Sequence, residues 1–118
     1  MARVSSVKNL KDGLMAHSDA GSFKRYDRGA AWERLKDAAG FRAGWADAYG
    51  HMLVATGRAD VMLDPIMHDW DCAPFPVILQ EAGGYFGDWE GNPTIYAQEA
   101  LSTNGSLLPQ LLGIINGE

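Results

Sequence analysis

The stretch from Asp64 to Phe86 constrains the fold of this chain more strongly than any other part of it. It opens with three carboxylates within eight residues, at Asp64, Asp69 and Asp71, and an apolar run follows. The apolar residues of that run recur at the i, i+3, i+4, i+7 spacing of one helix face, namely Phe75, Ile78, Leu79 and Ala82. The pattern predicts a helix over 71–82. The glycine pair at 83–84 ends it, because glycine accepts the left-handed conformation that follows a helix.

Asp71 is the expected N-cap of this helix, since an aspartate side chain can accept hydrogen bonds from the first amides. Pro74 fits the first turn, where its missing N–H would have no partner in any case. The apolar run Val61–Leu63 is a predicted strand that delivers Asp64 to its carboxyl end, where ligand sites of α/β sheets lie. Carboxylates crowded at such a junction suit a hard cation such as Mg²⁺. The alternative is an aspartate that only caps its helix.

Helices and strands alternate along the rest of the chain. Further helices are expected at 30–39 and 47–56 and, at the end, from Asn104 or Ser106 to Gly117. Strands are expected at 2–6, 13–17, 41–45, 85–89, 94–96 and 100–103, with a turn or short helical connection at 9–13 and a turn at 90–93. The expected buried stripes are Ala31, Leu35 and Ala38 beside Trp32 in one helix, and Ala48, Met52 and Ala55 in the next. The alternation predicts an α/β fold, a layered sheet with packed helices.

Length and composition favour one soluble globular domain over 1–118. The chain has 118 residues, 47% apolar and 21% charged, with no repeat, linker or low-complexity tract. No apolar run approaches the ~18 residues of a membrane span, and the first residues lack the apolar core of a signal peptide. The single cysteine, Cys72, excludes an internal disulfide and fits a reducing cytoplasm.

Charge is divided unevenly between the two halves of the chain. Residues 1–58 hold all ten Lys and Arg together with six acids, whereas residues 59–118 hold nine acids and no basic residue. The acids of the second half must therefore pair with the first half, stay solvated or hold cations. Solvation is expected for Asp88, Glu90, Glu99 and Glu118. No basic stripe interleaves with aromatic residues, so no nucleic-acid partner is expected.

The motif Trp70-Asp71-x-Ala73, followed by Glu81-Ala82-Gly83-Gly84, resembles the C-terminal signature of the inositol monophosphatase-like, metal-dependent phosphatases. The resemblance extends over roughly 3–116. It includes the segments 42–50 and 53–60 before the motif, and 84–91 and 102–105 after it. Within the family, the segment Trp45-Ala46-Asp47-Ala48-Tyr49-Gly50 most resembles the histidinol-phosphate phosphatase branch.

The resemblance implies a role for four residues. Asp71 would be a ligand of Mg²⁺. Asp47 and Asp64 would contact a small phosphorylated substrate, together with Ala46, which stands where that branch usually has glycine. The implied substrate is histidinol phosphate, an intermediate of histidine biosynthesis, with inositol monophosphate as the alternative.

The resemblance covers only the C-terminal half of the family. Its N-terminal catalytic half carries paired glutamates and an Asp-Pro-Ile-Asp-Gly-Thr motif, and neither occurs here. Asp64-Pro65-Ile66 begins like that motif, but Met67 and His68 follow. The chain is therefore expected to be inactive alone. It would pair with the N-terminal half of the phosphatase or self-associate through exposed surfaces, in which case it would be a homo-oligomer.

Three other interpretations of these residues stay open. The chain could be a non-catalytic, truncated relative that acts as an interaction or oligomerisation module. The residues His68, Asp69, Asp71 and Cys72 could form a transition-metal cluster, although adjacent residues rarely reach one ion together. His17, at the end of a predicted strand, could line a site, although a lone histidine beside a loop is more often an exposed or satisfied side chain.

Overall fold

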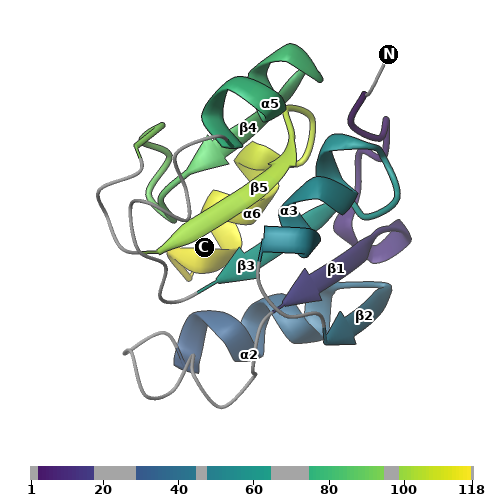
Figure 1. The fold of residues 1–118 in the computed structure, drawn as a ribbon. Coiled ribbons are helices and arrows are strands. Elements are labelled where there is room, and N and C mark those ends of the chain that lie inside the picture. The colour runs from purple at the N-terminus through teal and green to yellow at the C-terminus, as the bar shows by residue number, and fades with distance from the viewer. Residues whose placement is uncertain (1–2, 18–28, 45–47, 65–74, 95–98, 118) are drawn as a thin grey trace.

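The computed structural model describes residues 3–17, 29–44, 48–64, 75–94 and 99–117. Its centre is a five-stranded sheet with the strand order β2-β1-β3-β5-β4 (Figure 1). The strands are β1 (Leu14–His17), β2 (Phe41–Gly44), β3 (Val61–Asp64), β4 (Gly84–Gly87) and β5 (Ala100–Asn104). β1 pairs in parallel with both β2 and β3, whereas β5 runs antiparallel to its neighbours β3 and β4. The sheet is therefore mixed, with β5 as its one reversed strand among the described residues.

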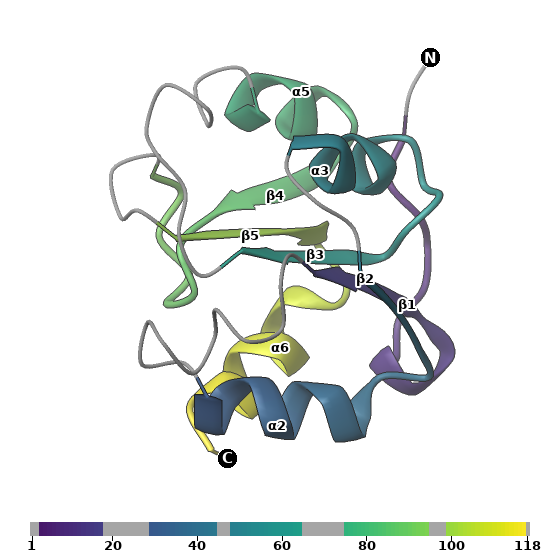
Figure 2. The same cartoon turned by 60° about the horizontal axis from the view of Figure 1, so that its bottom comes forward.

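Helices cover both faces of this sheet (Figure 2). α3 (Ala48–Ala55) and α5 (Phe75–Glu81) lie on one face, while α2 (Gly29–Ala38) and α6 (Leu108–Ile115) lie on the other. A short 3-10 helix, η1 (Leu10–Asp12), leads into β1. The predicted α/β fold, a layered sheet with packed helices, is confirmed.

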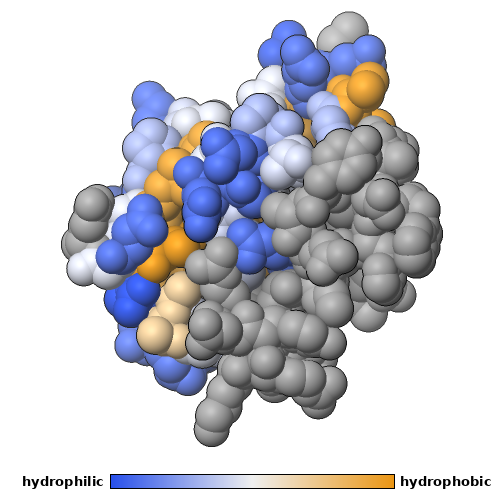
Figure 3. All heavy atoms as spheres, turned by 90° about the vertical axis from the view of Figure 1, so that its left-hand side faces the viewer, coloured by the Kyte–Doolittle hydropathy of each residue, from blue (hydrophilic) through white to orange (hydrophobic). Residues whose placement is uncertain are grey.

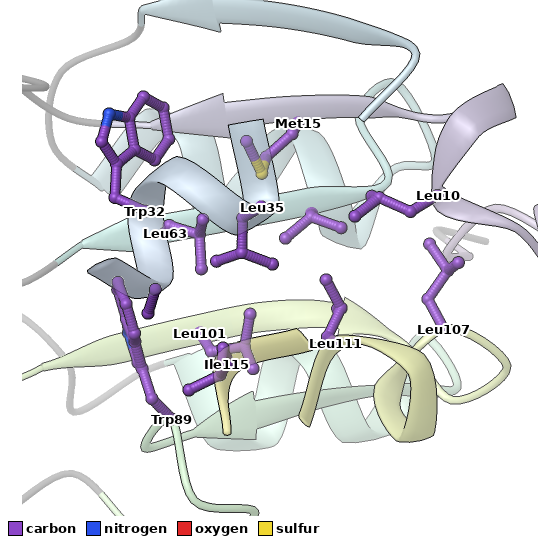
Figure 4. Close-up of a cluster of buried hydrophobic side chains, with 12 residues drawn as sticks. Leu10, Met15, Trp32, Leu35, Leu63, Trp89, Leu101, Leu107, Leu111 and Ile115 are labelled. Atoms are coloured by element: carbon purple, nitrogen blue, oxygen red, sulfur yellow. The ribbon is translucent and has the colours of Figure 1, made fainter. Parts of the chain in front are cut away.

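Each face of the sheet has its own apolar core. The core under α2 and α6 is formed by Leu10, Met15, Ala31, Trp32, Leu35, Val61, Leu63, Trp89, Leu101, Leu107, Leu111 and Ile115 (Figure 4). The core under α3 and α5 is formed by Ala16, Val54, Ala55, Ala59, Met62, Phe75, Leu79, Ala82, Phe86 and Ala100. Successive residues of β3 alternate between the two cores, as the pleat of a strand requires. All four residues of β3 are buried, which explains why a strand covered on both faces reads as an unbroken apolar run.

Side-chain hydrogen bonds tie the chain ends to the sheet. The Asp60 carboxylate accepts hydrogen bonds from the Ser5 hydroxyl and from the Leu14 N–H, the latter at 2.6 Å. The Asn104 side-chain amide donates to the carbonyls of Ser5 and Val7, at 3.1 and 2.9 Å. Its oxygen accepts the Leu107 N–H at 2.8 Å, just before α6. These bonds hold residues 3–7 against the sheet although the segment forms no strand.

The helix predicted over 71–82 contains α5. Phe75, Leu79 and Ala82 of its expected apolar stripe are buried and Ile78 is half-buried, and Gly83 follows with φ 86°. The start of that predicted helix at 71–74 lies outside the described residues. The predicted turn at 90–93 is also present, with Gly91 at φ 95°. No helix of the described residues is long and apolar enough to cross a membrane.

Three predictions of local structure are wrong. Residues 3–6 make no strand; within the described part of the chain, their backbone is tied to it by a bond from the Val4 N–H to the Ala82 carbonyl. The last helix begins at Leu108, because Asn104 belongs to β5 and residues 105–107 turn. Met52 is 37% exposed, and the buried face of α3 carries His51, Val54 and Ala55.

Candidate functional site

The parallel strands β2, β1 and β3 all end at the same edge of the sheet, which we call the carboxyl edge. His17 is in register with Gly44 on one side and with Leu63 on the other, so the last residues of the three strands lie side by side. Asp64 follows Leu63 at this edge. Figure 3 views the molecule from this side, where the described surface is mainly hydrophilic with a hydrophobic band. Ligand sites of open α/β sheets lie at such an edge.

Asp64 is the described residue that carries the expected chemistry. It is the last residue of β3, it is paired with Ala100 of β5, and only 7% of it is exposed. The alternation of β3 places it on the same face as Met62, the face covered by α3 and α5. Burying a carboxylate is costly unless it is paired or hydrogen-bonded. Asp64 is therefore held in position within the fold and is not a freely solvated surface acid.

α3 and α5 both begin near this edge. α3 follows the end of β2 and leads to the start of β3, and α5 follows the end of β3 and leads to the start of β4. Each helix must therefore run back across the sheet, with its N-terminus at the carboxyl edge. The first described residues are Ala48 in α3 and Phe75 in α5.

The expected site residues Ala46, Asp47 and Asp71 lie outside the described residues. In the sequence, Asp47 immediately precedes Ala48, and Asp71 stands four positions before Phe75. The structure thus brings Asp64 to the edge at which the two helices that follow these residues begin. The roles of the three residues stay predictions.

His17 lies at the same edge but on the other face of the sheet. Its ring packs against Trp32 of α2, with ring centroids 4.7 Å apart. The alternation along β1 agrees, because Met15 belongs to the core under α2 and α6 whereas Ala16 belongs to the opposite core. The structure therefore does not bring His17 and Asp64 together on one face.

His51 is a buried polar residue that the sequence did not single out. It is fully buried on α3, its Nδ1 hydrogen-bonds with the Ser102 hydroxyl of β5, and its Nε2 has no partner among the described residues. Its ring lies 5.3 Å from that of Phe75 and 5.2 Å from that of Phe86. Burial in this apolar setting lowers the pKa of His51 from 6.5 to about 3. His51 stands four residues before Ala55, which is the spacing of one helix face. A search for apolar stripes does not find it, because histidine is polar.

No three His, Cys, Asp or Glu side chains of the described residues gather where they could hold a metal ion. The described residues alone therefore do not make up a metal site, and the expected ligand Asp71 lies outside them. The alternative transition-metal cluster also lies outside the described residues, because its members are His68, Asp69, Asp71 and Cys72.

Two acids expected to be solvated instead accept hydrogen bonds from the backbone. The Asp88 carboxylate is 7% exposed and accepts the N–H groups of Glu90 and Asn92, at 2.9 and 2.8 Å. Glu99 accepts the Trp89 N–H at 3.0 Å. The expectation of solvation was wrong for Asp88. An aspartate before a Gly-Asn turn is a known signal for such a cap, so the sequence did contain the clue.

Comparison with known proteins identifies the family to which this arrangement belongs. Residues 2–116 match the model of a protein family that is described as the inositol monophosphatase family. The chain belongs to the inositol monophosphatase family. Members of this family are metal-dependent phosphatases that act on small phosphorylated substrates.

The chain is similar to proteins named histidinol-phosphatase. It is 47% identical to that of Chlorobaculum parvum over 88 residues, which is 73% of this chain and 34% of the relative. It is 31% identical to that of Streptomyces coelicolor over 113 residues, which is 96% of this chain and 42% of the relative. It is also 33% identical to human inositol monophosphatase 1 over 60% of this chain and 26% of that protein. The chain thus spans less than half the length of each of these relatives.

Solved structures show the same fold. An inositol monophosphatase from Zymomonas mobilis superposes with a TM-score of 0.90 at 18% identity, over 98% of this chain and 47% of that one. An inositol monophosphatase from Anabaena gives a TM-score of 0.85 at 24% identity, again over 98% and 47%. The expected family and fold are both confirmed.

Proposed function

We propose that this chain is the C-terminal half of a Mg²⁺-dependent phosphate monoester phosphatase that converts histidinol phosphate and water to histidinol and phosphate. The observation that carries the proposal is the 47% identity to a histidinol-phosphatase over 73% of this chain. Inositol monophosphate is the competing substrate, because human inositol monophosphatase 1 is also similar. The single cysteine favours a cytoplasmic protein.

Substrate selection is the proposed role of the carboxyl edge. Histidinol phosphate carries an ammonium group, whereas inositol monophosphate carries only hydroxyls beside its phosphate. Asp64 is a buried carboxylate, and Asp47 and Ala46 directly precede the first described residue of α3. A site that holds an acid against the ammonium group of its ligand favours that ligand over one that carries only hydroxyls.

Asp71 is the proposed Mg²⁺ ligand, and it would contribute one carboxylate oxygen to the ion. When bound, the ion would supply charge neutralisation at the phosphoryl oxygens and an activated water. Mg²⁺ prefers near-octahedral oxygen ligands, so most of its coordination must come from water and from another part of the protein.

The other part of the protein is proposed to dock on the outer surface of α3 and α5. α3 has no charged residue and α5 has only Glu81, whereas α2 on the opposite face carries Glu33, Arg34, Lys36 and Asp37. Met52 and Val77 are 37% and 59% exposed on this surface. A helix without a polar outer face is typical of one covered by protein. The proposed occupant is the N-terminal half that relatives possess and this chain lacks.

Substrate selectivity tests the proposal in the complete enzyme. Asp64→Ala and Asp47→Ala should each raise KM for histidinol phosphate by roughly tenfold or more, in line with the loss of a charged hydrogen bond. KM for inositol monophosphate should change far less, since that substrate has no ammonium group. Steady-state phosphate release measures both. Equal effects on the two substrates would refute the selectivity role.

Metal binding is tested with Asp71→Asn in the same enzyme. Asparagine caps a helix about as well as aspartate, so the melting temperature should hardly change. The Mg²⁺ concentration needed for half-maximal turnover should rise, because the charged ligand is lost. A lower melting temperature with an unchanged Mg²⁺ response would show that Asp71 is only a cap.

A further inference from the structure

His51 occupies a position in the fold that no apolar packing argument explains. Its neighbours are apolar, since Phe75 and Phe86 contact its ring and Val54 and Ala55 share its core. The rings of Phe75 and Phe86 also contact each other, with centroids 5.8 Å apart. We call these three rings and Ser102 the His51 cluster. An unpaired buried nitrogen is unfavourable, and an apolar side chain would avoid it here.

The His51 cluster joins the two helices that begin at the carboxyl edge. His51 stands in the first turn of α3, and Phe75 is the first residue of α5. Ser102 and Phe86 are directly paired across β5 and β4, so the cluster is anchored on two adjacent strands. A shift of either helix entrance would have to disrupt contacts with a side chain that belongs to the other helix.

His51 does not fit the part of an acid or a base. A catalytic proton carrier needs access to the substrate and a pKa near the working pH. This imidazole is fully buried and remains neutral at physiological pH. A neutral ring also adds no positive charge to this part of the fold.

We propose that His51 is a positioning residue that holds the described entrances of α3 and α5, at Ala48 and Phe75, at a fixed spacing. Its importance for catalysis rests on the proposed function, but the spacing itself does not. Local order of the helix that does not contain His51 is therefore the decisive measurement, and it needs neither metal nor substrate.

The test is amide hydrogen exchange, followed by NMR on the 118-residue chain. Met52 and Leu79 report the two entrances, because in an α-helix each amide bonds to the carbonyl four residues earlier, here Ala48 and Phe75. Leu112 reports α6 on the opposite face in the same way. The variant is His51→Ala with Ser102→Ala, which removes the ring that contacts Phe75 and Phe86 and leaves no unpaired hydroxyl.

The expected result is local loosening at both entrances. Exchange at Met52 and Leu79 should accelerate by about tenfold or more, while Leu112 stays within about twofold of the unmodified chain. Val54→Ala is the matched control, because Val54 is fully buried on the same helix and in the same core. It should lower global stability and accelerate the slowly exchanging amides together.

Exchange at Leu79 that changes no more than exchange at Leu112 would overturn the proposal. If the double variant does not fold, His51→Gln gives the same comparison while keeping a polar side chain opposite Ser102. Loss of Mg²⁺-dependent turnover in Asp71→Asn tests the proposed function separately, so the two proposals can fail independently.

Discussion

His51 makes the stability of this chain depend on pH at the scale of a single side chain. Its pKa falls from 6.5 to about 3 on burial, so the native state binds one proton fewer than the unfolded state between these values. The stability is fully present above pH 6.5 and is lost as the pH falls, by about 1.4 kcal/mol per pH unit. The unfolding free energy should therefore decrease measurably before most carboxylates protonate.

The matched comparison is the variant His51→Phe with Ser102→Ala. Between pH 6.5 and 5, the unmodified chain should lose about 2 kcal/mol more than this variant, as measured by urea unfolding at several pH values. Parallel pH profiles of the two proteins would show that His51 is protonated in the native state and that its burial does not control the titration.

The sequence was least informative about the hydrogen-bond partners of individual side chains. Asp60, Asp88 and Glu99 accept backbone N–H groups, and only the turn chemistry after Asp88 announces such a bond. Asp60 and Leu14 are far apart in the sequence, so their contact depends on the strand order. Local patterns carry no information about such pairs. Asp64 was the exception, because a strand end in an α/β fold has a predictable place.

At the scale of elements, the side chain of Asn104 in β5 connects the strand by hydrogen bonds to the N-terminal segment and to the residue before α6. Its amide nitrogen faces three oxygens, from the Ser5 carbonyl, the Ser5 hydroxyl and the Val7 carbonyl. Asn104→Asp keeps the oxygen that accepts the Leu107 N–H but turns the donor into a second acceptor. The variant should lose roughly 2–4 kcal/mol of unfolding free energy, because a buried charge would face unpaired carbonyls.

Chemical unfolding of Asn104→Asp measures this loss. Asn116→Asp is the matched control, since Asn116 is exposed and its substitution should change stability by no more than about 1 kcal/mol. A loss of under ~0.5 kcal/mol in Asn104→Asp would mean that the three oxygens have other donors.

Elements were predicted from the sequence where periodicity and glycine stops agreed. The strand before Asp64, the helix before Gly83 and the helix that follows Gly29 all appear. The errors have a physical cause in each case. In α3 apolar residues fill most positions of the sequence, so periodicity could not decide that Met52 faces outward and Val54 inward. At 3–6 the run could form a strand, but the Val4 N–H bonds to the Ala82 carbonyl and the side chains of Ser5 and Asn104 take up the segment.

At the scale of the whole molecule, the outer surface of α3 and α5 should determine what the chain binds. Met52→Glu with Val77→Glu should leave the fold intact, because both side chains are partly exposed, but should weaken docking of an N-terminal half by about tenfold or more. Lys36→Glu on α2 is the matched control, on the opposite face, and should have little effect. Titration calorimetry with a separately made N-terminal half measures the affinity.

Equal weakening of this affinity by the Met52, Val77 and Lys36 variants would point to a nonspecific charge effect. Sedimentation of the chain alone would reveal a second copy as the occupant instead.

The chain alone should have no measurable phosphatase activity. Hydrolysis of a phosphate monoester needs an acceleration of up to ~10²¹-fold, most of it from a metal-generated nucleophile and charge neutralisation. The sequence contains no paired glutamates and no Asp-Pro-Ile-Asp-Gly-Thr motif to complete a Mg²⁺ site beside Asp71. With one carboxylate, the ion would stay mostly hydrated and exchange freely. Mixing the chain with the N-terminal half of the Chlorobaculum parvum histidinol-phosphatase should restore some Mg²⁺-dependent phosphate release if the two surfaces fit. Turnover by the purified chain alone above ~1 s⁻¹, the lower end of ordinary enzymes, that disappears in Asp71→Asn would show that these residues contain a complete catalytic site.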